Sequence, residues 1–414
     1  MVPYQYHMKQ HSTSIIEKLY LLQPPPLAPE PYLKAYRGLA PALPHQRVPW
    51  NVVCPDKAYR ETERLSREHA EALQALDLSY YHDIYLPTES VFDALQPAKI
   101  NSDAWNEAVS QDKLGVVQSF QPNNNGYAMP VEYSRLDTVT GRLKVVAGPN
   151  ILHLPRSYRN ILESRWDGGH IVSLDYRALE PLTLLQLPYN NHPGISLASG
   201  TLPERVAEGL GGTIIGIDKS DIYMWMVDKL TRDMGLETGA LTRKVIKGVL
   251  LAQLYGASKD TIKEGIPVEL HGYAELLIHN VKVMFDVDGI TSRLRTEWIS
   301  EPSNQRWITS FYGRRITTTH QHTLLNHYIQ STAVDIAMLG FKNLIEYMSD
   351  LPPSFSEQII PLFVLHDALI MDVHPNRLNL LSGLGKVAST GFPKFPDQTT
   401  MFPLSIDKSF NLKA

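Results

Sequence analysis

The spacing of apolar residues predicts both helices and strands in this chain. Apolar side chains recur at the three-to-four-residue period of an amphipathic helix in four segments, 57–78, 219–235, 241–258 and 328–348. The run HIVSLDY at 170–176 is apolar and bounded by polar residues, which predicts a strand. Two further apolar runs within 359–373 flank His366 and Asp367 and predict a hairpin. These patterns predict an α+β protein.

The first 50 residues differ from the rest in their proline content. They include PPPLAPEP at 24–31 and further prolines at 41, 44 and 49. Proline fixes φ and lacks an N–H donor, so we expect residues 1–50 to form an extended extension that is poor in helix.

Cysteine content and hydropathy exclude several classes of protein. Cys54 is the single cysteine, so the chain has no internal disulfide and no cysteine-based zinc site. No apolar run reaches the roughly 18 residues of a membrane span, and the N-terminus has no apolar signal segment. We therefore expect no membrane association and a cytoplasmic location, in the host cytoplasm if the chain is viral.

Charge gives a local indication of a phosphate-binding surface. The formal net charge of −4 argues mildly against nucleic acid binding. Segment 135–165 nevertheless has a local charge of +4, because two acids, Asp137 and Glu163, stand against six cations: Arg135, Arg142, Lys144, Arg156, Arg159 and Arg165. A solvated basic face and a phosphate channel are both consistent with this run.

Two aspartates lie in apolar surroundings. Asp175 ends the strand at 170–176, and Asp367 lies between the two apolar runs of the hairpin. An ionised carboxylate is costly there unless it is paired or binds a metal. Each alone is more often a turn or cap residue, but together they suggest a carboxylate pair that holds two Mg²⁺ ions for nucleotidyl transfer.

The helix at 241–258 carries a stripe whose chemistry changes along its length. Arg243, Lys247, Leu251 and Tyr255 recur at every fourth position and therefore wind slowly around one side of the helix. Two cations, an apolar residue and an aromatic residue match the order of phosphates, sugar and base in a nucleotide. Cations early in a helix oppose its dipole, which favours a bound anion over a merely basic face.

Seven segments in order resemble the A family (polymerase I-like) of DNA polymerases, across about residues 131–414. LDYRALE at 174–180 resembles motif A, RKVIKGVLLAQLYG at 243–256 resembles motif B, and LHDAL at 365–369 resembles motif C. The other four are similar to conserved family segments and are TGRLKVVAGPNILHLP (140–155), FYGRRI (311–316), NHYIQSTAVDI (326–336) and FPLSIDKSFN (402–411).

The resemblance implies roles for matching residues. Asp175 and Asp367 would be catalytic metal ligands for two Mg²⁺ ions, together with the backbone carbonyl of Tyr176, and Lys247 would donate a proton to pyrophosphate. The implied deoxynucleoside triphosphate (dNTP) contacts are Arg243, Lys247, Leu251, Tyr255 and Glu180, with Glu180 as the steric gate against a ribose 2′-OH. The implied primer–template contacts are Arg142, Asn150, Arg314, Arg315, Asn326, Gln330 and His366.

Some positions depart from the family pattern. Leu251 and Ala252 replace an aromatic residue and a glycine of motif B, and Ala368 replaces the second acid of motif C. The remaining departures are Leu182 and His322, each in place of an arginine, and His153, in place of an asparagine. We expect an active enzyme with altered fine specificity.

The resemblance implies a right-hand polymerase fold with an antiparallel-sheet palm, helical fingers and a short helical thumb. The expected parts are the extension at 1–50, an abbreviated thumb at 51–130, palm at 131–200 and 301–414, and fingers at 201–300. The interval 176–242 is longer than usual for the family, which suggests an insertion in the fingers. No carboxylate cluster typical of a 3′–5′ exonuclease precedes the TGR segment, so we expect no intrinsic proofreading.

The expected partners are primer–template DNA and dNTPs, with room for a separate exonuclease, processivity factor or replisome protein. Three alternatives remain open. A single-subunit RNA polymerase shares the aspartates and the Lys-to-Tyr spacing but typically lacks the gate glutamate. A non-catalytic DNA-binding replication subunit is the second. An HD-type metal phosphohydrolase, read from His366–Asp367, is the third and needs that pair on a helix.

Overall fold

The structure, a computed structural model, describes residues 13–24, 34, 55–187, 221–300, 306–395 and 402–411. It divides into two compact units, Met1–His82 and Asp83–Ala414. The division falls in a π-helical turn, Tyr80–Tyr85, inside the segment 51–130 that we expected to form the thumb. The thumb assignment itself stays a prediction.

The first unit contains more helix than its proline content suggested. Residues 13–19 are helical because no proline interrupts the chain between Pro3 and Pro24, so the expectation of an extended chain was wrong there. Glu17 of this helix contacts His69 at 2.8 Å. His69 belongs to α4 (Asp56–Gln74), which replaces the predicted helix at 57–78. Residues 1–12, 25–33 and 35–50 of the extension lie outside the described residues.

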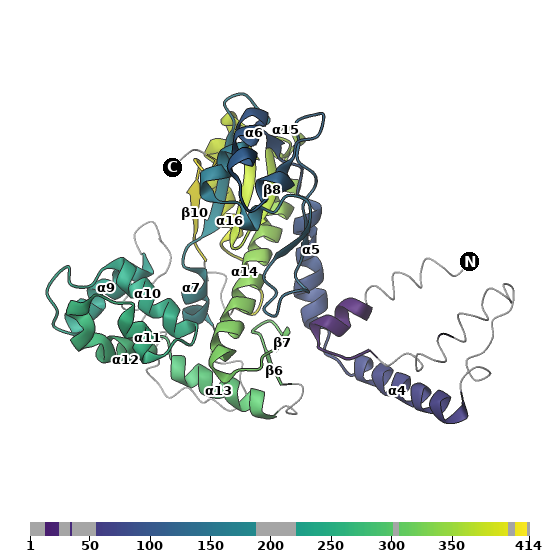
Figure 1. Ribbon diagram of the computed structural model, residues 1–414, viewed down its shortest axis with the longest axis vertical. Coiled ribbons are helices and arrows are strands. Elements are labelled where there is room, and N and C mark those ends of the chain that lie inside the picture. Colours follow the sequence, from purple (N-terminus) through teal and green to yellow (C-terminus); the bar gives the residue numbers. More distant parts are fainter. Residues whose placement is uncertain are drawn as a thin grey trace. The chain divides into compact units, whose positions relative to one another are not determined.

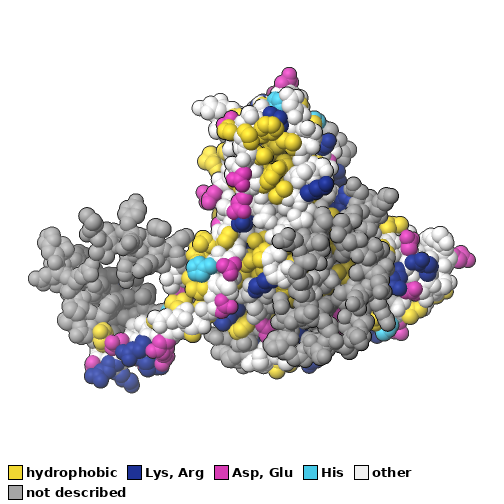
Figure 2. Space-filling view, turned by 180° about the vertical axis from the view of Figure 1, so that it is seen from behind, with side chains coloured by type: hydrophobic (Ala, Val, Ile, Leu, Met, Phe, Trp, Pro, Cys, Tyr) yellow, Lys and Arg dark blue, Asp and Glu magenta, His cyan; other side chains and the backbone are white. Residues whose placement is uncertain are grey.

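The surface of α4 carries charges of both signs. Arg60 pairs with Asp56, and Arg64 pairs with Glu61 and Glu68. Figure 2 shows basic and acidic side chains side by side on this helix. Because neither sign dominates, α4 does not form a single-sign basic surface for phosphates.

An antiparallel four-stranded sheet forms the centre of the second unit, in the order β10-β5-β9-β8. Strand β5 (His170–Tyr176) matches its predicted range, and β8 (Ile359–Leu365) with β9 (Ala368–Val373) forms the predicted hairpin. The edge strand β10 (Leu404–Asp407) pairs with β5. Every residue of β8 and β9 is buried, and all of them are apolar except Asp372 of β9.

Helix α14 (Leu324–Ser349) runs beside the sheet and contacts several surrounding helices (Figure 1). These are α5 (Leu86–Asp93), α7 (Leu179–Gln186), α13 (Val287–Ser300) and α16 (Leu381–Ala388). A Cβ atom on Gly340 would lie 1.7 Å from the Tyr176 hydroxyl, so only glycine fits there. That hydroxyl donates to the Ala388 carbonyl at 2.5 Å, which fixes the end of β5 against the helices.

Four helices form a separate group beside α7 (Figure 1). They are α9 (Ile222–Asp233), α10 (Arg243–Leu254), α11 (Lys259–Glu264) and α12 (Ala274–Met284). Side-chain oxygens of Asp221, Thr242 and Ser258 accept backbone N–H bonds at the N-termini of α9, α10 and α11. The predicted helices at 219–235 and 241–258 are therefore confirmed with shorter ends. Residues 188–220, which fall within the interval 176–242 where we expected an insertion, lie outside the described residues.

Smaller elements complete the second unit. Two-stranded sheets pair β1 (Lys99–Ile100) with β4 (Leu162–Glu163), β2 (Glu132–Ser134) with β3 (Lys144–Ala147), and β6 (Trp307–Thr309) with β7 (Arg315–Thr317). Two short helices are α6 (Ser102–Gln111) and α15 (Pro353–Ser356). The 3₁₀ turns are Val117–Phe120, Ile151–His153, Arg156–Ile161, Val268–Tyr273, Gln321–Thr323 and Pro375–Leu380. Among the described helices, none has the length and apolar character needed to cross a bilayer.

Candidate active site

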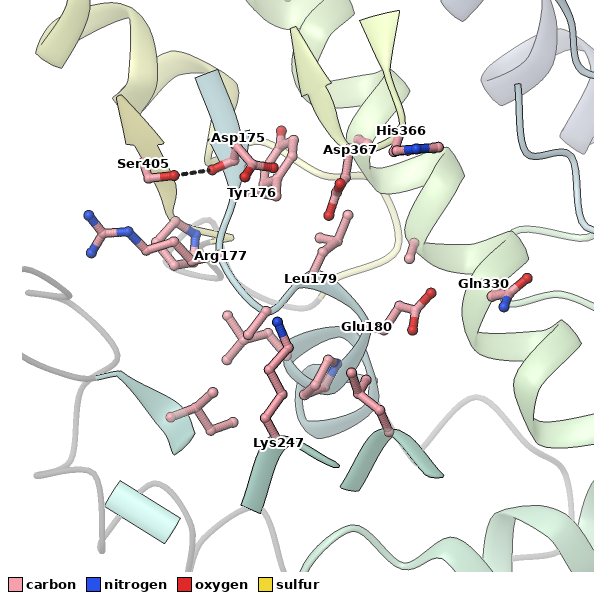
Figure 3. A pocket seen from close by; sticks show the side chains of 18 of the residues that line it. Asp175, Tyr176, Arg177, Leu179, Glu180, Lys247, Gln330, His366, Asp367 and Ser405 are labelled. Atoms are coloured by element: carbon pink, nitrogen blue, oxygen red, sulfur yellow. Dashed lines mark hydrogen bonds between the residues drawn. The ribbon is translucent and has the colours of Figure 1, made fainter. Parts of the chain in front are cut away.

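A pocket of about 740 Å³ lies where the end of β5, the start of α7, α10 and α14 meet (Figure 3). It brings together most of the predicted site residues: Arg142, Asp175, Tyr176, Glu180, Arg243, Lys247, Leu251, Tyr255, Gln330, His366 and Asp367. Segments far apart in the sequence therefore converge on one cavity.

The sheet register brings the two aspartates together. Asp175, the penultimate residue of β5, lies opposite Ala368, the first residue of β9. Asp367 occupies the two-residue turn just before β9, and its carbonyl accepts the Tyr176 N–H at 3.2 Å. Asp367 is thus in the turn and not on a strand, but the expected adjacency of the two acids is confirmed.

The two carboxylates lie in a region with little compensating charge. Burial, reinforced by the charge of Asp367, raises the pKa of Asp175 to about 7, and Lys247 only partly opposes this. Burial also raises the pKa of Asp367. In the described part of the chain neither carboxylate forms an ion pair, so the site favours a cation between them.

The donor set fits Mg²⁺. The described residues contain no group of three or more His, Cys, Asp or Glu side chains that could enclose a metal. Mg²⁺ does not require such a group, because it usually takes one or two carboxylates and completes its octahedron with water and substrate phosphates. Asp175 and Asp367, with the Tyr176 carbonyl, provide that kind of open site.

Glu180 is held by residues from two other segments. Ala178 has a left-handed φ of 49° immediately before α7 and turns the chain from β5 into that helix. The Glu180 carboxylate accepts hydrogen bonds from the Tyr255 hydroxyl at 3.0 Å and from Arg142 Nη2 at 2.9 Å. It is therefore fixed between the palm and α10.

The basic stripe of α10 faces the same pocket. Lys247 extends from α10 toward Asp175 and Asp367 (Figure 3) and forms no ion pair within the described residues. Arg243 forms an ion pair through Nε with Asp221, the N-cap residue of α9. Its guanidinium lies over the ring of Tyr223, 4.9 Å from the centroid. Helix α9 thus holds Arg243 through an ion pair, whereas Lys247 contacts α9 only through the Tyr223 ring, 5.9 Å from its Nζ.

His366 and Gln330 border the pocket on the palm side. His366 has a left-handed φ of 57° in the hairpin turn. Burial, with the positive charge of Arg142 and neighbouring groups, lowers its pKa, so the imidazole is neutral near pH 7. Gln330 on α14 accepts from the Thr140 hydroxyl at 3.5 Å. Both side chains line the pocket, and their contact with primer–template DNA stays a prediction.

Four predicted primer–template residues lie outside the pocket lining. Asn150 contacts His153 at 3.0 Å, and Arg315 lies over the Trp307 ring. The Asn326 side-chain oxygen on α14 has no hydrogen-bond partner in the described structure. Arg314 is 4% exposed and donates to the Arg135 carbonyl at 3.0 Å, which indicates a structural role in this region. Its predicted DNA contact has no support from this position.

The local charge at 135–165 is smaller at the surface than the sequence indicated. Arg135 is 1% exposed and pairs with Asp335 of α14. Arg165 pairs with the buried Asp372 at 3.1 Å. Both cations compensate internal carboxylates that lie about two hundred positions away in the chain, and counting local charges could not reveal this.

The departures from the family pattern occupy definite places. Leu182 is buried, and both Leu182 and Leu251 line the pocket. Ala368 is 5% exposed and faces Asp175 across the sheet, where an acid would add a third negative charge. Gly256 packs against the His322 backbone, since a Cβ there would lie 2.2 Å from its carbonyl oxygen. His322 therefore borders the end of α10.

Sequence reasoning missed several residues of the site. Arg177, Asp221, Tyr223 and Ser405 also line the pocket. Ser405 Oγ donates to the Asp175 carbonyl at 3.1 Å (Figure 3). Asp221 was recognisable only as a polar residue at a helix start, and nothing in its spacing pointed to Arg243.

Comparison with known proteins supports the fold. No family model and no curated protein sequence matches the chain. A solved structure, the POL domain of Pol1 from M. smegmatis in complex with DNA primer–template and dNTP, is similar with a TM-score of 0.59 at 13% identity, over 96% of this chain and 81% of that chain. The expected right-hand architecture is thereby confirmed at the level of the fold: the chain has the α+β fold of the polymerase I (A-family) polymerising module.

Proposed function

We propose that this protein is a template-directed DNA polymerase that extends a primer 3′ end with dNTPs. One observation supports this most strongly. Asp175 and Asp367, two partly buried carboxylates that form no ion pair in the described structure, share a pocket with Lys247 and Arg243. A site for divalent cations beside a site for phosphates is what nucleotidyl transfer requires.

The reaction joins the primer 3′ oxygen to the α-phosphorus and breaks the bond to pyrophosphate. Bound Mg²⁺ would activate the 3′ hydroxyl and stabilise the leaving pyrophosphate. Asp175 and Asp367 would hold two such ions with the Tyr176 carbonyl. Lys247 lies on the opposite side of the pocket, from where it would protonate the departing oxygen (Figure 3). Arg243 would neutralise charge on the β and γ phosphates.

Glu180 would select the sugar. Two hydrogen bonds fix its carboxylate, so it cannot easily move away from a ribose 2′-OH. Leu251 would pack against the sugar and base, and Tyr255 would stand at the template end of the stripe. Selection by a fixed side chain favours deoxynucleotides over ribonucleotides.

Primer–template DNA would lie along the palm beside His366, Gln330 and Arg142. Asn150, Arg315 and Asn326 remain candidates for contacts beyond the pocket. Minor-groove acceptors are similar for every base pair, so polar contacts there are compatible with any sequence. We also propose that this polypeptide removes no mismatched 3′ end and relies on a separate exonuclease, with a processivity factor or replisome protein as a further partner.

Two alternatives differ from this proposal at named residues. A ribonucleotide polymerase would not need a fixed carboxylate such as Glu180 at the sugar position. A non-catalytic DNA-binding subunit would not need Asp175 and Asp367 side by side, because their repulsion costs stability. The phosphohydrolase reading requires His366–Asp367 on a helix, whereas the structure has them in a hairpin turn.

Primer extension on a defined template with Mg²⁺ tests the proposal. We expect extension with dNTPs, much weaker extension with NTPs, and no removal of a mismatched primer end. Asp367→Asn should abolish extension, whereas Asp233→Asn, on the exposed surface of α9, should not. Extension by Asp367→Asn at the rate of the unmodified chain would refute the site, and excision of the mismatch would refute the absence of proofreading.

A further inference from the structure

The N-terminus of α9 contacts both cations of the α10 stripe. Asp221 forms the ion pair with Arg243 Nε, and the Tyr223 ring lies 4.9 Å from the Arg243 guanidinium carbon and 5.9 Å from Lys247 Nζ. Both α9 residues line the pocket. We propose that Asp221 and Tyr223 are positioning residues that set Arg243 and Lys247 in place for a nucleoside triphosphate. The inference rests on the proposed function and identifies residues that determine its substrate affinity.

Asp221 is itself fixed, which suits it to orient another group. One carboxylate oxygen accepts the Tyr223 backbone N–H at 3.0 Å and caps α9. The other accepts from Arg243 Nε. Because the cap holds the carboxylate in one orientation, the guanidinium that it binds is held as well.

The ion pair leaves the phosphate-binding part of Arg243 available. A guanidinium has one donor at Nε and four at the two Nη atoms. In the described structure only Nε forms a hydrogen bond. The Nη groups, which form the fork that grips phosphate oxygens, remain free for a ligand. Asp221 therefore orients the side chain without occupying its fork.

The Tyr223 ring offsets the repulsion between the two cations of the stripe. Arg243 and Lys247 are like charges one helical turn apart, and such pairs repel. The tyrosine ring is 3% exposed and lies within cation–π range of both. Burial raises the pKa of its phenol to about 12, so the ring stays neutral at physiological pH. The ring face therefore holds both cations on one side of α10.

The Asp221 carboxylate would also repel a nearby triphosphate. The direction in which its removal changes triphosphate affinity therefore tests the inference. If Asp221 mainly orients Arg243, its removal weakens triphosphate binding. If Asp221 instead competes with the triphosphate for Arg243, its removal strengthens binding. The free Nη groups favour orientation, because competition would be expected to occupy the fork.

The test measures Mg²⁺–dNTP affinity for the full chain on a dideoxy-terminated primer–template, with KM and kcat of extension measured in parallel. Asp221→Ala should raise the dissociation constant and KM about tenfold, the effect of losing one charge-assisted hydrogen bond, and should change kcat about twofold or less. Asp221→Asn retains an acceptor oxygen at the same place, so its dissociation constant for dNTP should lie between those of the unmodified chain and Asp221→Ala. Asp233→Asn, on the same helix and in a surface ion pair, is the matched control and should bind like the unmodified chain.

Two substitutions of Tyr223 separate the ring from the hydroxyl. Tyr223→Leu should weaken dNTP binding about fivefold, whereas Tyr223→Phe keeps the ring face and should restore affinity to within about twofold. Tyr273→Leu, an exposed tyrosine outside the pocket, controls for loss of an aromatic side chain.

The possible outcomes are distinct. Unchanged or tighter dNTP binding by Asp221→Ala overturns the positioning role, and so does an equal loss of primer–template affinity, which would indicate a general structural defect. If Tyr223→Phe and Tyr223→Leu lose dNTP affinity equally, the proposed role of the ring is overturned. If the unmodified chain binds dNTP in an Asp221-dependent manner but extends no primer, the proposed function fails while the positioning role stands.

Discussion

The palm and the fingers handle their charges in opposite ways. In the palm, Asp175 and Asp367 lie next to each other, and burial raises the pKa of both. The charge of Asp367 raises the pKa of Asp175 further, and neither acid forms an ion pair in the described structure. In the fingers, Arg243 already has an internal acid and an aromatic partner. The palm therefore needs an added cation, whereas the fingers are preorganised for an added anion. This difference assigns metal ions to one side of the pocket and phosphates to the other.

Removing either palm acid tests the metal side and should have the largest effect. Asp175→Ala or Asp367→Ala should lower the rate of extension at least about 1000-fold, because metal ions stabilise the transition state by several kcal/mol. Primer–template affinity, measured by fluorescence anisotropy, should change little. Variants with extension within tenfold of the unmodified chain would show that these acids do not bind the catalytic metals.

Removing Lys247 tests the phosphate side. Lys247→Ala should lower kcat about 100-fold, as expected for loss of a general acid. Arg243→Ala should act mainly on the KM for dNTP, since Arg243 would bind ground-state phosphates. Rapid-quench measurement of a single addition separates the two effects. A Lys247→Ala variant with normal kcat and raised KM would assign both cations to binding alone.

Glu180 lies between the two sides and tests sugar selection. Glu180→Ala should reduce the preference for dNTP over NTP by about 50-fold, because the space for a 2′-OH opens. Tyr255→Phe removes one of the two hydrogen bonds to the carboxylate and should reduce the preference for dNTP over NTP only about fivefold. Relative kcat/KM for a matched dNTP and NTP measures both. Equal selectivity in Glu180→Ala and the unmodified chain would remove the gate assignment.

The smallest expected effect concerns stability without metal. Asp175→Asn should stabilise the metal-free protein at pH 8 by about 1 kcal/mol, because it removes one of two adjacent, partly buried like charges. Mg²⁺ should raise the melting temperature of the unmodified chain more than that of the variant. Thermal unfolding with EDTA and with Mg²⁺ provides the comparison. A variant that is less stable than the unmodified chain in EDTA would indicate that the palm acids are already compensated.

The sequence predicted the main helices and strands and the pair of aspartates, because burial leaves a regular apolar pattern. The strands at 170–176 and 359–373 are apolar because they lie inside the sheet. Helix α10 shows the helical period because it buries one side, whereas α14 is apolar around its middle because nearly every residue of 331–341 is buried. Acids that interrupt such patterns are conspicuous. Asp175 and Asp367 were identified in this way, and the antiparallel register then brought them together.

Other features depended on contacts that no local pattern encodes. Arg135 and Arg165 resembled phosphate-binding cations but compensate Asp335 and Asp372 inside the protein. Asp221 resembled an ordinary helix cap but also binds Arg243. Each pairing joins residues distant in sequence, so it could be found only from the fold.

A structure of the complex tests the central claim most directly. The sample would contain the full chain, a dideoxy-terminated primer–template, the matching dNTP and Mn²⁺ in place of Mg²⁺, so that anomalous scattering locates the ions. We expect Mn²⁺ between Asp175 and Asp367, with the triphosphate against Arg243 and Lys247. Metal peaks away from both aspartates, or a triphosphate bound elsewhere on the protein, would contradict it.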